Sequence, residues 1–402
     1  MEATSPNLSF IPSLNSQISQ HSSTTHHHCI STFKGHSSYV FSLTFSGKFL
    51  YSGSSDKEIR ICIRDPSNQS SSESTKVVAI GKGAVKSLVI SGDKLFSAHQ
   101  DHKIRVWQIQ NNHNSTHHHH DQKYKLLATL PTLADRFLRF FPAKNYVQVR
   151  RHKKITWVHH VDTISALCLS KDETLLYSVS WDRTLKIWRT SDFKCLESVT
   201  HAHDDAINAL ALCINGFVYT GSADKKIKIW RKINGEKMKH SVMAVLDKHK
   251  SAVNALALST DGSILYSGGC DCEILVWEKN YNNGGGGGGG NGGLMDLVGG
   301  LRGHTRAILC LVVISDLVCS GSADKTVRVW RRNNGDDHQN RNITYSCLAV
   351  MEGHTGPVKC LTASVDHNNS TMINSTSATS YLIYTGSLDC DIKVWQILVP
   401  ST

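Results

Sequence analysis

Seven copies of one short spacing run through this chain and constrain its fold more than any other feature. In each copy, a Ser or Thr is followed four residues later by Asp, and six residues after the Asp stands Trp or, once, Cys. The copies are Ser52–Asp56–Cys62, Ser97–Asp101–Trp107, Ser178–Asp182–Trp188, Thr220–Asp224–Trp230, Ser267–Asp271–Trp277, Ser320–Asp324–Trp330 and Thr385–Asp389–Trp395. Six of them follow a His, namely His36, His160, His203, His249, His304 and His354. This periodicity indicates a repeat architecture in which each unit buries its core against its neighbours.

Short apolar runs separate these motifs. Runs such as INALALC (207–213), VNALALS (253–259) and ILCLVVI (308–314) have the length of strands. They are nearly continuous, which favours strands buried on both faces. A second run precedes each Ser or Thr, and a third, such as IKIW, follows each Asp across a short turn that suits a hairpin. The pattern therefore predicts an all-β fold.

The best-preserved copies are GSADKKIKIW (221–230), GSADKTVRVW (321–330) and GSLDCDIKVW (386–395). From about Cys29 to Leu398 the chain resembles the WD40 repeat, whose unit is a four-stranded blade of a β-propeller. The resemblance implies a single seven-bladed propeller over residues 29–398. This sequence departs from the family in lacking Asp after each Trp, in Cys62, and in Gly81, which stands where the second copy should have its His.

The recurring His, Ser or Thr, and Asp could be mistaken for a catalytic triad. A triad needs one exposed nucleophile beside a substrate, whereas this set recurs up to seven times beside a Trp. The resemblance implies instead a buried hydrogen-bonded tetrad in each blade. The expected tetrads are His160, Ser178, Asp182 and Trp188; His203, Thr220, Asp224 and Trp230; His249, Ser267, Asp271 and Trp277; His304, Ser320, Asp324 and Trp330; and His354, Thr385, Asp389 and Trp395. We expect no catalytic residue, no cofactor and no metal site.

The two ends of the repeat region are expected to meet. The segment Cys29–Phe33 resembles CLESV (195–199) and CLAVM (347–351), which precede other His residues. It should therefore be the outer strand of the last blade and close the ring. Residues 1–28 are rich in Ser and His and are expected to be disordered. The chain has no apolar run of 18 residues, and its first residues lack the pattern of a signal peptide.

Twelve cysteines are present, and they are expected to be reduced thiols. Five of them fall on predicted strands and should be buried apolar residues: Cys168, Cys213, Cys310, Cys319 and Cys360. Cys270 and Cys272 form a close pair, but the Asp271 between them belongs to the repeat and no second pair completes a zinc site. The His tracts 26–28 and 117–120 are interpreted as solvated low-complexity sequence.

Low-complexity loops are expected at 66–75, 111–121, 280–293, 333–342 and 366–380, which are rich in Ser, Asn, Gly and His. In a WD40 blade, the loop carrying the His and the turn carrying the Asp share one rim of the ring, and these inserts fall mainly on the opposite rim. That opposite rim should tolerate changes of length, which argues against it as the main recognition surface.

The insert at 131–158 is different, because it holds seven basic residues and one acid, or +6 of the chain's formal +11. Leu133, Phe137 and Phe141 have the spacing of one face of a short helix, with Thr132 as its cap and Pro142 as its stop. If LLATL (126–130) is an outer strand, the insert lies on the rim of the His loops. If KITWV (154–158) is that strand, the insert lies on the opposite rim.

The stretch LP…DR…PAKNYVQVRRHKK inside this insert, together with the ring, resembles the plant JINGUBANG-type WD-repeat family. That resemblance implies a plant regulatory protein of cytoplasm and nucleus. It further implies a role in pollen and development and in transcriptional control.

The sequence thus favours a non-enzymatic scaffold that binds other proteins, such as transcription regulators or acidic segments. The candidate partner-binding residues are Arg136, Arg139, Arg150, Arg151, Lys153, Lys154, Trp157 and Trp181. Weaker candidates on the rim of the Asp turns are Gln100, Asp162, Asp205, Cys270, Arg306 and Leu388. Trp181 is either exposed on that rim or packed under the insert.

Two other functions remain open. The basic insert, with Phe140, Tyr146 and Trp157 among its charges, could bind nucleic acid. A ubiquitin-ligase substrate receptor is the third hypothesis, although the Trp-Asp-x-Arg signature of such proteins is absent. No membrane association is expected.

Overall fold

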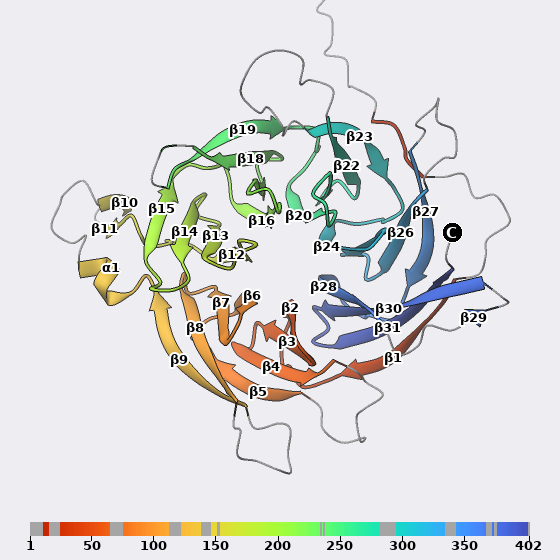
Figure 1. The fold of residues 1–402 in the computed structure, drawn as a ribbon, viewed down its shortest axis with the longest axis horizontal. Coiled ribbons are helices and arrows are strands. Elements are labelled where there is room, and N and C mark those ends of the chain that lie inside the picture. The colour runs from red at the N-terminus through yellow and green to blue at the C-terminus, as the bar shows by residue number, and fades with distance from the viewer. Residues whose placement is uncertain are drawn as a thin grey trace, which may run out of the picture.

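Seven antiparallel sheets stand around a central opening in the computed structural model, and each sheet is one blade of a β-propeller (Figure 1). The structure describes residues 11–15, 25–64, 75–111, 122–137, 146–150, 153–233, 235, 238–280, 295–333, 343–366, 372–373 and 376–400. The predicted all-β, seven-bladed architecture is confirmed.

In blades 1 to 6, four antiparallel strands follow one another in chain order from the opening outward, whereas the outermost strand of blade 7 is the N-terminal β1. Blades 1 to 3 consist of β2 Val40–Ser46, β3 Phe49–Ser54, β4 Glu58–Ile63 and β5 Lys76–Ile80; β6 Val85–Ser91, β7 Lys94–His99, β8 Ile104–Asn111 and β9 Gln122–Leu130; and β12 Ile164–Leu169, β13 Leu175–Ser180, β14 Leu185–Arg189 and β15 Cys195–Val199. Blades 4 to 6 consist of β16 Ile207–Leu212, β17 Val218–Ser222, β18 Ile227–Lys232 and β19 His240–Leu246; β20 Val253–Leu258, β21 Ile264–Gly269, β22 Ile274–Lys279 and β23 Met295–Leu301; and β24 Ile308–Ile314, β25 Leu317–Ser322, β26 Val327–Asn333 and β27 Thr344–Met351. Blade 7 consists of β28 Val358–Val365, β30 Thr376–Ser387, β31 Ile392–Pro400 and β1 His26–Phe33, with the short β29 Met372–Ile373 paired to β30.

The ring closes as the sequence predicts. Strand β1 pairs antiparallel with β31, from His26 opposite Leu398 to Phe33 opposite Ile392. Figure 1 shows the red N-terminal strand beside the blue C-terminal strand. Both ends extend slightly beyond the predicted limits of 29 and 398, because β1 begins at His26 and β31 ends at Pro400.

Burial within a blade differs from the sequence expectation. The second strands β3, β21 and β25 are buried at every residue, because neighbouring blades cover both of their faces. The innermost strands instead alternate between buried and half-buried residues, as in β20. The half-buried residues, such as Leu256 and Leu258, still pack against the core between blades 4 and 5. Both faces of the strand therefore meet apolar neighbours, but one face is covered less completely than the continuous apolar run predicts.

Two predicted loops or tails need correction. Within residues 1–28, Ile11 and Leu14 are buried, and residues 25–28 belong to or adjoin β1, so these parts are ordered. Within 366–380, Asp366 is buried and β30 begins at Thr376. The Asp366 carboxylate accepts hydrogen bonds from Ser380 Oγ and Gln396 Nε2, at 3.0 and 3.1 Å. Most residues of the other four low-complexity loops lie outside the described residues.

The basic insert leaves the ring between β9 and β12, in the loop that leads to His160. Strand β9, which includes LLATL, pairs with β8 as the outer strand of blade 2. The alternative, in which KITWV (154–158) forms the outer strand of blade 2, is wrong. Strand β11 Lys153–Thr156 pairs instead with β10 Tyr146–Arg150 in a separate hairpin. In Figure 1 this hairpin and α1 Leu133–Phe137 lie outside the ring, beyond β15, rather than over the opening.

Candidate partner-binding surface

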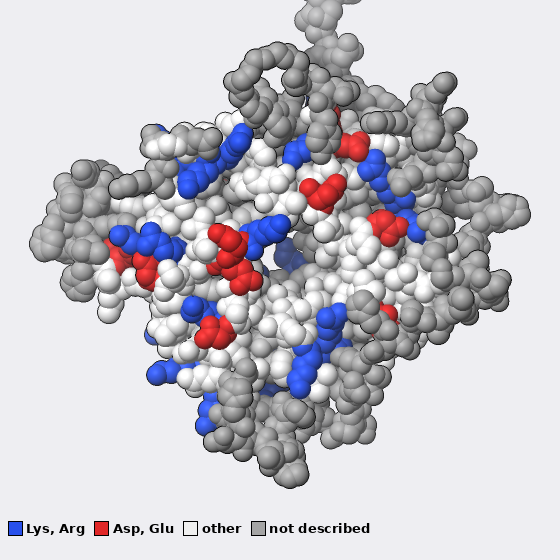
Figure 2. Space-filling view, viewed as in Figure 1, with Lys and Arg blue, Asp and Glu red and all other residues white. Residues whose placement is uncertain are grey.

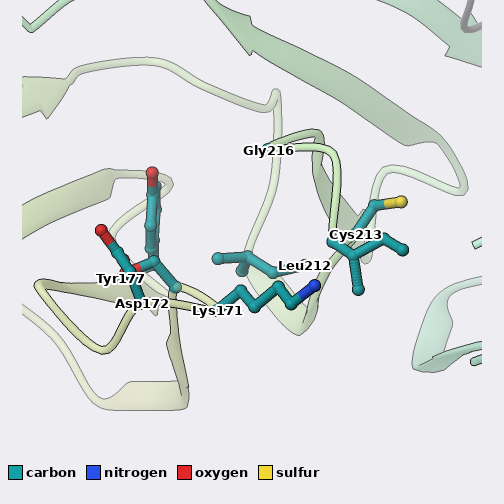
Figure 3. A pocket seen from close by; sticks show the side chains of 8 residues that line it. Lys171, Asp172, Tyr177, Leu212, Cys213 and Gly216 are labelled. Carbon is teal, nitrogen blue, oxygen red and sulfur yellow. The ribbon is translucent and has the colours of Figure 1, made fainter.

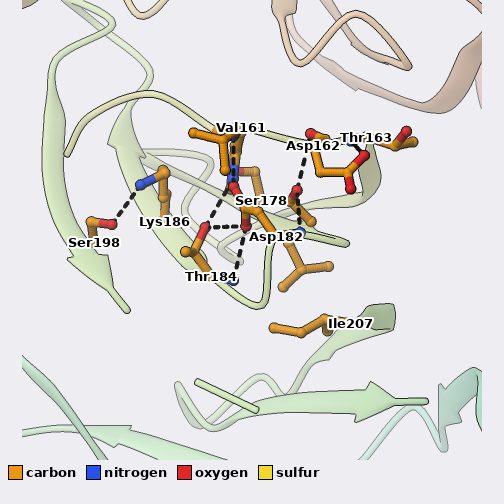
Figure 4. A network of polar contacts seen from close by, with 12 residues as sticks. Val161, Asp162, Thr163, Ser178, Asp182, Thr184, Lys186, Ser198 and Ile207 are labelled. Carbon is orange, nitrogen blue, oxygen red and sulfur yellow. Dashed lines mark hydrogen bonds and ion pairs between the residues drawn. The ribbon is translucent and has the colours of Figure 1, made fainter. Parts of the chain in front are cut away.

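A chain of hydrogen bonds in blade 3 joins the loop before the first strand to the turn after the second (Figure 4). His160 bonds through Nδ1 to Asp182 Oδ2 at 3.0 Å and through Nε2 to Ser178 Oγ at 2.8 Å. Trp188 Nε1 donates to the same Ser178 Oγ at 2.9 Å, and the Val161 amide donates to Asp182. The carboxylate therefore holds the loop and the turn together.

The order of these contacts is that of a Ser-His-Asp triad, but the setting is not. Ser178 is completely buried, and its oxygen already meets both His160 and Trp188. Burial lowers the pKa of His160 although Asp182 opposes this, so burial favours the neutral ring. A substrate cannot reach this hydroxyl, and the set works as a structural tie.

Five further blades repeat the tie between His and Asp and between His and Ser or Thr, with distances of 2.7 to 2.8 Å. The pairs belong to His36, His203, His249, His304 and His354. In four of these blades the repeat Trp completes the tetrad by donating to the hydroxyl. In blade 1, Cys62 takes the place of the Trp. The tetrads predicted from the sequence are therefore present.

In blade 2, which lacks a His in the loop before its first strand, His99 on the second strand takes the place of that His. His99, two residues after Ser97 on β7, bonds to Ser97 Oγ at 2.8 Å and to the Gly83 carbonyl at 3.0 Å. A Cβ on Gly81 would lie 2.4 Å from the His99 ring, so that ring fills the space of the missing side chain. Asp101 pairs with Arg105 instead. The signal in the sequence is His99 itself, since the other copies have Ser or Gly at that position.

Each innermost strand carries a β-bulge near its first residue, where one residue drops out of the pairing with the second strand. The bulge residues are Phe41, Lys86, Ser165, Asn208, Asn254, Leu309 and Lys359. The innermost strands line the opening (Figure 1). Each bulge lies at the start of its strand, directly after the loop that precedes it, so the bulge residues form a belt around the opening at the end where the His loops and Asp turns lie.

On one half of this belt, side-chain hydrogen bonds join neighbouring innermost strands. Ser165, Asn208 and Asn254 each donate a side-chain hydrogen bond to the first carbonyl of the next innermost strand, those of Ile207, Val253 and Ile308. Polar groups on this side are therefore satisfied within the ring.

On the other half of the opening, the bulge residues Phe41, Lys86 and Lys359 are joined by Tyr39, which precedes β2, and Trp181, which follows β13. We call these five residues the Lys–aromatic mouth. Lys86 Nζ lies 3.5 Å from the centre of the Phe41 ring and 5.8 Å from that of Trp181. Tyr39 meets Phe41 edge to face at 6.3 Å. Burial, followed by the charge of Lys359, lowers the pKa of Lys86 to about 8. Within the described residues, no carboxylate pairs with either lysine, so this half of the opening has uncompensated positive charge.

Trp181 is 42% exposed and Tyr39 48% exposed, which is unusual for large aromatic side chains in a closed ring. The weaker rim candidates are also at the surface: Gln100, Asp162, Asp205, Cys270 and Arg306 are exposed and Leu388 is half-buried. These residues surround the same opening, because the turn of each blade lies beside the start of an innermost strand.

The basic insert is attached to the ring through an acid rather than through its apolar residues. Asp135 is buried, and its carboxylate accepts the Cys195 amide of β15 at 2.8 Å. The Thr132 hydroxyl accepts the Asp135 amide, as the predicted cap requires. Leu133, the first residue of the predicted apolar face, is 67% exposed and does not dock on the ring. Phe141 and the predicted stop Pro142 lie outside the described residues.

Few of the basic candidates can be placed. Arg136 lies in α1, Arg150 ends β10, and Lys153 and Lys154 begin β11, while Arg139 and Arg151 lie outside the described residues. Trp157 is half-buried against the core of blades 2 and 3. Its carbonyl accepts a hydrogen bond from the buried Lys186 Nζ at 2.6 Å, so this residue has a structural role.

The opposite rim has a shallow hollow of about 480 Å³ between blades 3 and 4 (Figure 3). Tyr177, Cys213 and Lys171 line it, and Lys171 extends across it. Asp172 caps its own loop by accepting hydrogen bonds from Ser170 and Thr174. Tyr177, the aromatic residue of the hollow, is buried. The hollow therefore lacks the exposed aromatic rings that characterise the Lys–aromatic mouth.

On the face shown in Figure 2, lysines and arginines alternate with acids around the opening and form no continuous area of one sign. This pattern does not favour a track for a nucleic-acid backbone on that face. Among the described residues, one group of three potential metal ligands is close together, that of His36, Asp56 and Glu58. His36 is bonded to Asp56, and Glu58 pairs with Arg60, so these atoms are already engaged.

No helix in the described part of the chain has the length and apolarity needed to span a bilayer. Comparisons with known proteins agree with the ring. The crystal structure of the WD40 β-propeller domain of Doa1 superposes with a TM-score of 0.61 at 19% identity, covering 92% of this chain and 96% of that one. At this identity the likeness concerns the fold.

Two plant proteins from Arabidopsis thaliana are similar in sequence. Autophagy-related protein 16 is 24% identical over 207 residues, which are 51% of this chain and 36% of that protein. Protein ROOT INITIATION DEFECTIVE 3 is 26% identical over 189 residues, which are 43% of this chain and 40% of that protein. The chain thus matches well under half the length of these relatives.

The family profile "WD domain, G-beta repeat" matches residues 27–62, 152–189, 193–231, 240–278, 295–331 and 345–396. These segments make up more than half of the chain. The unmatched stretch between 62 and 152 contains blade 2, in which His99 replaces the loop His. The repeats, the tetrads, the closed ring and these matches establish that the chain belongs to the WD40 family of β-propellers.

Proposed function

We propose that this chain is a non-enzymatic interaction scaffold that binds an acidic segment of a partner protein at the Lys–aromatic mouth. The observation that carries the proposal is the pairing of two uncompensated lysines with exposed aromatic rings. Lys86 and Lys359 supply charge for a carboxylate, and Trp181 and Tyr39 supply exposed apolar area, the residue types that dominate protein interfaces.

The partially buried position of Lys86 strengthens such an interaction. A charge-assisted hydrogen bond to a half-buried lysine is screened less by solvent than a bond at an open surface. A protein without such a ligand leaves that charge partly desolvated and near a second positive charge. An acidic side chain relieves both costs at once.

The finer biological role follows from the resemblance of the insert to the JINGUBANG-type family. We propose that the chain is a plant regulatory protein of cytoplasm and nucleus that acts in development, including pollen, through partners that control transcription. The likeness to a plant protein whose name refers to root initiation supports a developmental role, although it covers less than half of either chain.

A direct binding experiment tests the proposed site. The probe is a synthetic Glu-rich peptide, and the variants are Lys86→Gln/Lys359→Gln in the mouth and Arg150→Gln/Arg151→Gln/Lys153→Gln/Lys154→Gln in the insert. Lys325→Gln, an exposed lysine on an Asp turn, is the matched control. We expect at least a tenfold loss of affinity for the mouth variant and less than a twofold loss for the control.

Loss of affinity in the insert variant alone would move the binding site to the insert. Binding of a single-stranded oligonucleotide in preference to the peptide would favour the nucleic-acid hypothesis. Equal affinities across all variants would contradict both the mouth and the insert as binding sites.

A further inference from the structure

A short N-terminal segment, Ile11–Asn15, lies along the edge between two blades and pairs with residues more than 280 positions later in the sequence. It forms parallel bridges with Gly300 of β23 and Tyr345 of β27, which are the outer strands of blades 5 and 6. In Figure 1 it is the red segment that passes between these two strands. The segment thus fills the space between two sheet edges.

Backbone hydrogen bonds hold the segment on both sides. The Leu14 amide donates to the Gly300 carbonyl at 3.0 Å, and the Gly300 amide donates to the Pro12 carbonyl at 2.9 Å. On the other side, the Tyr345 amide donates to the Leu14 carbonyl at 2.8 Å. These are the contacts by which an extended peptide adds to an open sheet edge.

Side chains give the groove its selectivity. Ile11 enters the core between blades 4 and 5, and Leu14 enters the core between blades 5 and 6. The Asn15 side chain bonds to both the amide and the carbonyl of Arg302, and the Arg302 guanidinium donates to the Ile11 carbonyl at 3.0 Å. Pro12 and Ser13 are exposed. The groove therefore selects an apolar residue, Leu and Asn at positions 1, 4 and 5 of the segment, and leaves positions 2 and 3 exposed.

The edge of blade 5 is shaped for this close approach. A Cβ on Gly299 would lie 2.7 Å from both Leu14 Cγ and the Pro12 carbonyl. The corresponding positions on the outer strands of blades 2, 4 and 6 are Ala128, Ala244 and Ala349. A glycine inside a strand weakens it unless another backbone must come near. Blade 5 has the glycine where the segment lies.

We propose that the groove between β23 and β27 is a docking site for an extended partner segment of the pattern apolar–x–x–Leu–Asn, and that residues 11–15 occupy this groove in the free chain. The occupant is held by five residues and is tethered to β1 by residues 16–25, so it competes through a local concentration of roughly millimolar order. A partner segment therefore binds by displacing it. This site is separate from the Lys–aromatic mouth and does not depend on the function proposed there.

The test uses a fluorescein-labelled peptide of residues 8–18 and the full-length chain. The variant Ile11→Asp/Leu14→Asp releases the segment, because neither carboxylate can enter the apolar sites. We expect saturable binding to this variant, at least tenfold tighter than to the unaltered chain, in which the groove is filled. A peptide carrying Leu14→Asp should not bind.

Two further substitutions in the released variant locate the binding. Gly299→Val should abolish binding, since a side chain there collides with the peptide. Gly300→Ala is the matched control and should still bind, because its Cβ would make ordinary contacts of 3.5 Å or more. Leu14→Ser is a milder release if the double variant does not fold.

No binding to a folded released variant up to about 1 mM peptide, the order of the tethered concentration, would overturn the proposal. The segment would then be only a brace between blades. Binding that survives Gly299→Val would also overturn it, because the peptide would then lie elsewhere.

Discussion

The buried hydroxyl of each tetrad meets a His on one side and, in six blades, a Trp on the other. In blade 6, Asp324 adds the third connection by accepting hydrogen bonds from His304 Nδ1 and from the Thr305 and Thr326 amides. Burial by itself raises the pKa of Asp324, but these hydrogen bonds outweigh it and hold the pKa below its usual range. The stability that Asp324 contributes is therefore present above about pH 4 and is lost as the pH falls.

Asp324→Ala should lower the free energy of unfolding by roughly 1–3 kcal/mol, because it leaves a buried ring nitrogen and two amides without their partner. Asp316→Ala is the matched control. The Asp316 side chain is 42% exposed and pairs with Arg331, which also donates to the Pro400 carbonyl and so keeps a partner. Its loss should therefore cost within about 0.5 kcal/mol. Denaturant unfolding at pH 7 measures both, and equal values would contradict the role of the tetrad.

His99 offers a sharper test of the same chemistry. Gly81→His should destabilise the ring by about 1–3 kcal/mol, because the new side chain overlaps the His99 ring. Gly81→His/His99→Ser restores the arrangement of the other blades and should recover part of that loss. A double-mutant cycle measures the coupling, and strictly additive effects would contradict the exchange of one His for the other.

Lys86 makes binding at the mouth depend on pH. Its lowered pKa of about 8 in the free chain means that the charged form needed by an acidic ligand is lost as the pH rises through 8. Affinity for the Glu-rich peptide should therefore fall between pH 7 and 9.5, a range in which the peptide carboxylates stay ionised. The Lys86→Gln variant should lack this change, and a pH dependence equal to that of the unaltered chain would exclude Lys86 as its source.

Single residues also show where sequence reasoning succeeds and fails. The tetrads could be predicted because the same four residue types recur at a fixed spacing. The burial of Asp366 could not be predicted, because this residue stands at the start of a polar stretch. Only the pairing of β28 with β30 brings Ser380 and Gln396 to it. The bulge residues Lys86 and Lys359 could not be grouped either, because ring closure brings them near each other.

At the scale of secondary-structure elements, the helix of the basic insert was also only partly predictable from the sequence. The cap Thr132 could be predicted from the local sequence, since a cap bonds to an amide three residues later. The docking of α1 could not be predicted, because a five-residue helix has too small an apolar face to decide its orientation. The contact that decides it joins Asp135 to the edge strand β15, 60 residues later.

Asp135→Ala should release α1 from blade 3. The Cys195 amide would lose its acceptor at a buried site, and we expect a loss of roughly 1–3 kcal/mol with faster amide exchange at Cys195. Leu133→Ser is the matched control on the same helix, and its exposed position predicts little change in either quantity. If Leu133→Ser were the more damaging substitution, the helix would dock through its apolar face after all.

The whole ring depends on one pairing between segments more than 350 residues apart. Each blade is stabilised by its two neighbours, so an open ring would expose the faces of two blades at once. Strand β1 prevents this by giving blade 7 its outer strand and by burying Phe33 against the core of blades 7 and 1. The fold class was predictable from the repeats because this closure adds no new kind of contact.

Removing residues 1–33 should therefore destabilise the entire ring, not one blade. The deletion leaves the edge of β31 unpaired and uncovers apolar surface, so we expect a lower melting temperature together with self-association. The full-length Ile11→Asp/Leu14→Asp variant separates this effect from loss of the groove segment, since it retains β1. A ring closed by β1 predicts a much larger loss for the deletion than for that variant in thermal unfolding, with oligomers visible by size-exclusion chromatography. Equal melting temperatures would instead place the stability of the ring in the stacking of blades, with β1 a dispensable edge.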